Sequence, residues 1–350
     1  MFNRILIPLD GSLLAERAIP HAEQFARIFG AKIVLLRVLE VATDFENQFP
    51  TDPLSWQLRK AEADMYMQSV ASRIRDHLIA TEKHPEERVE YAVLEGRTAE
   101  NIIDFAHNMK VDLLVISSHG SGGLSRWGMS SVIQKVIDLI YLPLLIIRSY
   151  DLPGETDETT HYRRILLPID SSRRAECAFS PAIVLAKGGT ERAPKAENEM
   201  QESEMQIADG DEWVPKLLLA SVISPPEIPI PAPYPVEIHR LSEQLLHVSR
   251  QAVLAYLSEM KLRLPVESET RVVESKNISS AIQELAEQEN IDLVVMSAHG
   301  YSGHLTYPYG SVTRNSIEFG NKSLLVIQDI PLSQVRLTAS AVAAEKTGRR

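Results

Sequence analysis

The chain has 350 residues, of which 44% are hydrophobic and 24% charged, a composition typical of folded globular proteins. This length accommodates two or three domains of ordinary size. The formal net charge of -11 argues against a general binder of nucleic acids or anionic membranes, because phosphate groups favour an excess of Lys and Arg. The single cysteine, Cys177, excludes a disulfide framework within the chain and a cysteine-based zinc site, and we interpret it as a structural thiol.

Short runs of Val, Ile and Leu alternate with longer amphipathic segments, a pattern typical of parallel sheets covered by helices. In the first half we predict strands at Arg4–Leu9, Lys32–Leu39, Arg88–Leu94, Leu113–Ser117 and Leu144–Arg148. Between them we predict helices at Leu13–Phe29, Leu54–Thr81, Ala99–Asn108 and Ser131–Leu139. The second half repeats this order from Arg164, with later strands at Lys216–Ile223, Glu267–Val273, Leu293–Ser297 and Ser323–Gln328.

Two motifs occur once in each half. The segment RILIPLDGS at 4–12 matches RILLPIDSS at 164–172, and VISSHG at 115–120 matches VMSAHG at 295–300. The two members of the second pair are further apart in the sequence than those of the first pair. The difference shows a net insertion of 20 residues in the second copy. The insertion falls in the acidic stretch at about 188–215, which we interpret as a solvated surface loop.

We therefore predict two α/β domains, 1–150 and 162–330, each a doubly wound, Rossmann-like sheet of five parallel strands in the order 3-2-1-4-5. Residues 151–161, with a Pro-Gly pair and several acidic residues, are expected to be a linker, and residues 331–350 a flexible tail. No run of apolar residues reaches the roughly 18 that a membrane span needs, and no cleavage region follows the first strand. We expect a cytoplasmic protein with no membrane partner.

Ligands of such open sheets bind at the carboxyl ends of the strands where the strand order reverses. This places Asp10 beside the loop at 119–120, and Asp170 beside the loop at 299–300. A carboxylate there can accept hydrogen bonds from a ribose hydroxyl or an adenine amino group, while a Gly-rich turn and a helix N-terminus attract phosphate. The alternatives are that each aspartate caps the following helix, and that His119 and His299 stabilise turns. For the histidines we favour the turn-stabilising interpretation over a catalytic base.

These residues resemble the universal stress protein family, part of the adenine nucleotide alpha hydrolase-like superfamily. Its nucleotide-binding members carry Gly-x-x-Gly, nine residues and then Gly-Ser/Thr, after a first strand that ends in Pro-x-Asp. The second copy has SAHG at 297–300, nine residues and then Gly310-Ser311, and lacks only the first glycine. The first copy has SSHG at 117–120 and then Ser130-Ser131, so two of its three glycines are replaced. The resemblance covers 1–149 and 162–329.

The resemblance implies a nucleotide site in each copy, and we favour the second, because a serine in place of glycine puts a Cβ where a phosphate needs space. The implied residues of the second copy are Pro168, Asp170, Val222, Met296, Ser297, His299, Gly300, Gly310, Ser311 and Val312. The weaker set in the first copy is Pro8, Asp10, Val38, Ser117, His119, Gly120, Arg126, Ser130, Ser131 and Val132. For the valines, plain core packing is the alternative.

We expect a stress-response protein that binds ATP, alone or with Mg2+, or a related adenine nucleotide, and acts as a regulatory binding module without assigned catalytic residues or a metal site. The alternatives are a slow ATP hydrolase, although no Walker phosphate loop is present, and a dimerisation protein with vestigial pockets. Family members usually pair through their fifth strands. Leu144–Arg148 and Ser323–Gln328 should then meet within one chain as a pseudo-dimer, and a homodimer of two chains stays open.

Overall fold

The computed structural model describes residues 1–40, 53–79, 85–118, 129–148, 162–188, 215–226, 235–301 and 308–329. The expected linker at 151–161, nearly all of the acidic insertion and the tail at 331–350 lie outside these ranges. Three of the candidate site residues, His119, Gly120 and Arg126, lie outside them as well.

The first half has five strands: β1 (Arg4–Pro8), β2 (Lys32–Leu39), β3 (Val89–Glu95), β4 (Leu113–Ser117) and β5 (Leu144–Ile147). Its helices are α1 (Leu13–Glu16), α2 (Ala18–Phe29), α3 (Pro53–Ile79), the 3-10 helix η1 (Pro85–Arg88), α4 (Thr98–Asn108) and α5 (Ser131–Leu139). The helix predicted at Leu13–Phe29 is divided into α1 and α2 at Arg17. Pro20 explains the division, because it has no N–H to donate to the carbonyl of Glu16 four residues earlier.

The second half repeats the arrangement with β6 (Arg164–Pro168), β7 (Lys216–Ile223), β8 (Ser268–Glu274), β9 (Leu293–Ser297) and β10 (Ser323–Ile327). Its helices are the 3-10 helix η2 (Ala175–Ala178), α6 (Phe179–Gly188), α7 (Val236–Arg263), α8 (Ile278–Gln288) and α9 (Ser311–Phe319). Each predicted strand is present, with bounds that differ by no more than one residue. None of the described helices is long and apolar enough to cross a membrane.

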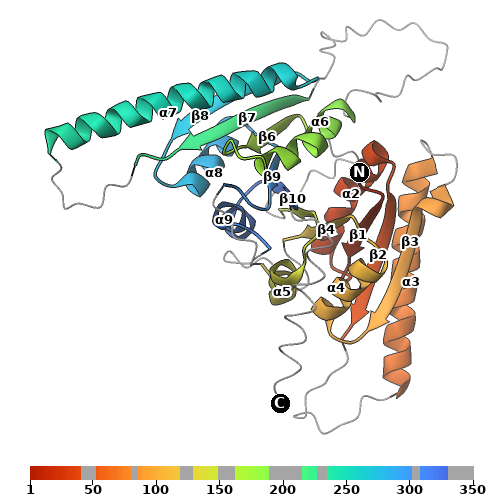
Figure 1. Ribbon diagram of the computed structural model, residues 1–350. Helices are drawn as coiled ribbons and strands as arrows, with labels where there is room; N and C mark the ends of the chain where they lie inside the picture. Colours follow the sequence, from red (N-terminus) through yellow and green to blue (C-terminus); the bar gives the residue numbers. More distant parts are fainter. Residues whose placement is uncertain are drawn as a thin grey trace, which may run out of the picture.

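All ten strands form one sheet, in the order β3-β2-β1-β4-β5-β10-β9-β6-β7-β8 (Figure 1). Each half has the predicted doubly wound order 3-2-1-4-5 with parallel neighbours. The fifth strands pair antiparallel, with Leu145 opposite Leu325. This pairing is the one that the family resemblance implied. It covers the edge that each five-stranded half would otherwise expose, and it makes the two halves a single continuous sheet.

Two layers of helices cover the sheet, and successive residues of each strand alternate between them. On β1, Ile5 and Ile7 pack into one core and Leu6 into the other. The first core contains residues of α2, α3, α6 and α7, and the second contains residues of α4, α5, α8 and α9. Both cores include residues of both halves. The strands are therefore apolar at nearly every position because they are buried on both faces.

Polar contacts also join the two halves beside the β5–β10 pair. His21 Nδ1 on α2 lies 2.6 Å from the hydroxyl of Tyr162, whose ring packs edge-on against Phe25. The buried Arg148 donates hydrogen bonds to the carbonyls of Ser316 (2.8 Å) and Ile317 near the end of α9. A cation suits this place, because the last carbonyls of a helix carry its negative end. Side-chain hydrogen bonds therefore join the two halves in addition to the pairing of β5 with β10.

Candidate functional site

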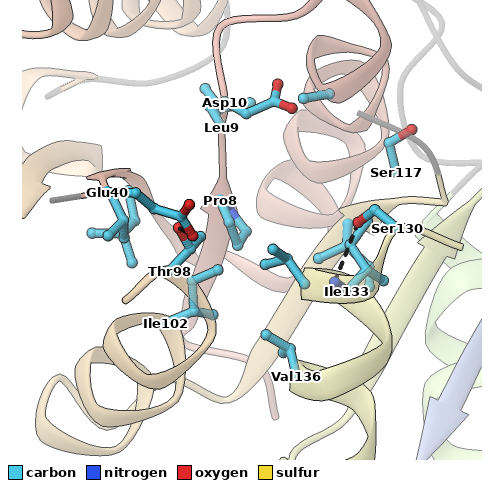
Figure 2. Close-up of a pocket in the computed structure, with 15 residues that line it drawn as sticks. Pro8, Leu9, Asp10, Glu40, Thr98, Ile102, Ser117, Ser130, Ile133 and Val136 are labelled. Atoms are coloured by element: carbon cyan, nitrogen blue, oxygen red, sulfur yellow. Dashed lines mark hydrogen bonds between the residues drawn. The ribbon is translucent and has the colours of Figure 1, made fainter. Parts of the chain in front are cut away.

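Each half has a cavity at the carboxyl ends of its strands. The first cavity, of about 260 Å³, lies between the strand ends and the helices α4 and α5 (Figure 2). It is lined by Pro8, Leu9, Asp10, Ala15, Leu36, Val38, Glu40, Thr98, Ile102, Ile116, Ser117, Ser130, Val132, Ile133 and Val136.

The second cavity occupies the equivalent place in the other half and has a volume of about 320 Å³. It is lined by Pro168, Ile169, Asp170, Ala175, Ala220, Val222, Ile278, Ile282, Met296, Ser297, Gly300, Tyr309, Gly310, Ser311, Val312 and Thr313. Burial raises the pKa of Tyr309, so its hydroxyl is neutral at ordinary pH.

The structure brings most of the predicted site residues together around these cavities. In the second half, every predicted residue except His299 lines the cavity. In the first half, the described candidates line it except Ser131, which is exposed on the first turn of α5. His299 is fully buried, with Nδ1 2.7 Å from Asp329 Oδ1. This contact joins the loop after β9 to the residues after β10, and the interpretation of His299 as a turn-stabilising residue stays a prediction.

The aspartate at the end of the first strand organises each site. Asp170 accepts hydrogen bonds from the backbone N–H of Ser172 (3.1 Å) and of Tyr301 (2.6 Å), so it ties the β6 turn to the loop that follows β9. The following turn is capped by Ser172, whose hydroxyl accepts from Ala175. In the first half Ser12 is likewise the N-cap of α1. The alternative in which the aspartates are the helix caps is therefore wrong.

The surroundings of the two glycines of the second site differ. A Cβ on Gly300 would lie less than 3.0 Å from Asp170 Oδ2, closer than real Cβ atoms approach. Gly300 thus leaves room for the nearby carboxylate in its present position. Gly310 has φ -71°, and its Cβ would be 3.5 Å from the nearest atom, an ordinary contact. Its counterpart Ser130 has φ -60°, so the serine is not strained there.

The helices that begin at these two positions differ in their caps. Ser130 is the N-cap of α5, and its hydroxyl accepts a hydrogen bond from Ile133 N (3.3 Å; Figure 2). Gly310 is the N-cap of α9 and provides no side-chain acceptor. Ser311 is the first residue of the helix itself. The first turn of α9 therefore meets the second cavity with N–H groups that no capping side chain satisfies.

Sequence reasoning missed the residues that α4 and α8 add to the cavities. Thr98 Oγ1 donates to Glu40 Oε1 (2.8 Å) in the first cavity, and Ile278 takes the place of Thr98 in the second. No motif marks these positions. Aligning the two copies by their later landmark would have placed Thr98 opposite Ile278 at the start of equivalent helices. The first cavity thus has two carboxylates on its wall, Asp10 and Glu40, and the second has one, Asp170.

Within the described ranges, no group of three or more His, Cys, Asp or Glu side chains is placed to hold a metal ion. The second cavity therefore combines an apolar wall, one anchored carboxylate and one uncapped helix N-terminus. These features suit a ligand with a flat apolar part, hydroxyl or amino groups and an anionic end.

Comparison with known proteins gives the same picture from sequence and from fold. A model described as the Universal stress protein family matches residues 1–148 and 214–328. A universal stress protein of Methanocaldococcus jannaschii is 29% identical over 151 residues, which cover 42% of this chain and 83% of that protein. A universal stress protein of Thermus aquaticus is 30% identical over 149 residues, covering 42% of this chain and all (100%) of that protein.

A solved structure extends this likeness to both halves. The crystal structure of a universal stress protein from Archaeoglobus fulgidus covers 94% of this chain and 100% of its own, with a TM-score of 0.55 and 16% sequence identity. At this identity the likeness shows the shared fold alone. The curated relatives above match one half of the chain each, whereas this structure matches the tandem arrangement.

Proposed function

The chain belongs to the universal stress protein family, and from this premise we propose that it is a regulatory module of the stress response that binds ATP or a related adenine nucleotide in the second cavity. The observation that supports this proposal is the N-terminus of α9, which meets the cavity without a side-chain cap. We also propose the cytoplasm as its location and 1–150 and 162–330 as its two domains.

The wall of the second cavity suits an adenosine. Val222, Ile278 and Met296 provide an apolar surface against which a purine ring packs. The carboxylate of Asp170 is held in one orientation by its two backbone donors. It is thereby preorganised to accept a hydrogen bond from a ribose hydroxyl or an adenine amino group, at little cost in side-chain entropy.

The phosphates belong at the start of α9 in this proposal. The N–H groups of the first turn and the positive end of the helix dipole attract an anion, and the exposed Ser311 adds a hydroxyl donor. Mg2+ would accompany ATP as the ion of its phosphates. The protein residues bind and orient the nucleotide, and we assign none of them a catalytic step.

The first cavity is the weaker candidate for two physical reasons. The hydroxyl of Ser130 already accepts from an N–H of the first turn of α5, so one donor is taken from a phosphate. Glu40 adds a second carboxylate to the wall that holds Asp10, and no Lys or Arg among the described lining residues offsets their repulsion of an anionic ligand. We therefore propose that one nucleotide binds per chain.

Isothermal titration of the full chain with ATP, ADP and AMP, with and without Mg2+, tests the proposal. Gly310→Ser gives α9 the cap that α5 has, and Ser130→Gly removes that cap from α5. Because a hydrogen bond to a charged group contributes about 1.5–3 kcal/mol, Gly310→Ser should weaken ATP binding at least about tenfold. Ser130→Gly should leave the affinity unchanged. No saturable nucleotide binding, or a loss in Ser130→Gly alone, would contradict the proposal.

A further inference from the structure

A third cavity, of about 310 Å³, lies in the first half on the opposite face of the sheet from the first cavity. Because side chains alternate along β2, Leu36 and Val38 line the first cavity, whereas Arg37 and Leu39 line the third. The other walls come from the turn after β1 and from α3, which contributes Arg59. The third cavity is thus a separate compartment, although Asp10 borders both.

Two guanidinium groups line the third cavity and form no ion pair among the described residues, although the carboxylates of Asp10 and Glu62 line it as well. Arg37 is half-buried, with Cζ 5.2 Å from the centre of the Tyr66 ring, and Arg59 has Cζ 5.4 Å from the centre of the Trp56 ring. Neither makes an ion pair or a hydrogen bond to another residue within the described part of the chain. By contrast, Arg73, further along α3, pairs with a carboxylate.

When a guanidinium stacks against a ring, the N–H groups at its edge stay available to donate hydrogen bonds. Their preferred acceptors are oxyanions. A half-buried cation without such a partner is unfavourable, because it has lost part of its hydration. Two arginines held by aromatic rings around one cavity therefore form a preorganised receptor for an anion that accepts several hydrogen bonds. A phosphate group has this geometry and charge.

The two copies of the domain differ at these positions. Gly11 has φ +84°, and a Cβ there would lie less than 3.0 Å from Arg37 Nη1, so the turn closes directly on the guanidinium. The second copy has Ser171 and Ser221 in place of Gly11 and Arg37. Ser171 keeps φ at +62°, and its copy has no arginine at that position of β7. The glycine and the arginine thus belong together and occur in the first copy alone.

The rest of the surrounding structure is the same in both copies. Tyr66 donates to Glu16, and Tyr256 donates to Glu176, at equivalent places on α3 and α7. Counted from these tyrosines, Ser249 stands where the first copy has Arg59. Both arginines of the third cavity are therefore additions to a shared framework, and they are not needed to build it.

We propose that the third cavity binds the phosphate group of a small, hydroxyl-bearing phosphate ester. Arg37 and Arg59 donate hydrogen bonds to the phosphate oxygens, and the exposed carboxylate of Glu62 at the rim accepts from a hydroxyl of the ligand. This site is separate from the nucleotide site proposed for the second cavity, and it does not depend on that site.

Titration of the full chain with ribose 5-phosphate tests this assignment, with ribose as the ligand control. We expect one phosphate ester per chain and no binding of ribose. Arg37→Ser, which copies the second half, and Arg59→Ser should each lower the affinity at least tenfold. Arg59 is exposed, so its replacement leaves the fold intact and keeps the test valid if Arg37→Ser perturbs packing. Arg263→Ser, the same change of charge on α7, should leave the affinity unchanged.

Three results would overturn the assignment. They are no saturable binding of ribose 5-phosphate, an affinity in Arg37→Ser and Arg59→Ser equal to that of the unchanged chain, and an affinity for ribose equal to that for ribose 5-phosphate. If ribose 5-phosphate instead occupies the second cavity, Gly310→Ser will weaken its binding and Arg37→Ser will not, which also refutes the assignment. The ATP affinity of Arg37→Ser distinguishes the two proposals. It should equal the ATP affinity of the unchanged chain whether or not the phosphate ester binds.

Discussion

Replacing Gly300 by alanine should destabilise the second half by forcing the Asp170 carboxylate away from its backbone donors. The new Cβ would lie less than 3.0 Å from Asp170 Oδ2, the oxygen that accepts from Tyr301 N at 2.6 Å. The Cβ and the carboxylate oxygen cannot both keep these positions. The carboxylate must move, and the link between the turn after β6 and the loop after β9 is lost.

The size of the effect follows from that hydrogen bond. A hydrogen bond to a charged group contributes about 1.5–3 kcal/mol, and the exposure of Asp170 reduces this to about 1–2 kcal/mol. For a protein of this size the melting temperature should fall by roughly 1–3 °C. Gly310→Ala should change stability by less than about 0.5 kcal/mol, because its Cβ makes only an ordinary contact at φ -71°.

Thermal melts of the full chain, repeated in urea, compare the two alanine variants. The decisive control is a double-mutant cycle in which Gly300→Ala is made in an Asp170→Ala background, where no carboxylate remains to collide. The cost of Gly300→Ala should then fall below about 0.5 kcal/mol. If it stays the same, or if the two glycine variants are equally stable, our explanation of Gly300 is wrong.

Three further predictions concern the contacts between the halves and the single thiol. Burial lowers the pKa of His21 from 6.5 to about 4, so the unfolded chain takes up its proton first as the pH falls. The stability is complete above pH 6.5 and should drop by about 2 kcal/mol between pH 7 and pH 5 in urea melts, and His21→Gln should remove this dependence. Arg148→Met leaves the carbonyl of Ser316 without its charged donor and should lower the free energy of unfolding by about 2–3 kcal/mol; no change in the melting temperature would refute this role. Burial raises the pKa of the Cys177 thiol to about 12, so a thiol reagent at pH 8 should label the folded chain roughly a thousandfold more slowly than the chain in denaturant, and equal rates would contradict the burial.

Most of the fold was predictable from the sequence because its signals are local and repeated. The apolar runs that become β1 to β10 are buried on both faces, so their composition alone marks them. In the second half, the Asp and His-Gly landmarks correctly indicated which strand ends meet. What local patterns did not show was the break at Arg17 within the first predicted helix, which depends on one proline.

The residues of the candidate sites were predictable where they belong to a sequence motif. They were not predictable where the packing of another helix or strand places them in the cavity. Asp170, Gly310 and Val312 belong to motifs, and they line the second cavity as expected. Glu40 and Thr98 carry no motif, and only the packing of α4 against β2 places them in the first cavity. Nothing local identifies the buried pair of His299 with Asp329, which lie 30 residues apart in the chain.

The sequence by itself determined that the chain is a tandem of two doubly wound α/β units and predicted that residues at the strand ends of each come together, since hydrophobic periodicity and two repeated motifs are properties of neighbouring residues. Only the tertiary structure decided which residues of other elements line those pockets and lie against those glycines. Gly300 lies against a carboxylate 130 positions earlier in the chain, and Gly11 lies against the guanidinium of Arg37 on the next strand. Such contacts arise when parallel strands bring distant residues within contact distance, so no window of sequence contains both partners.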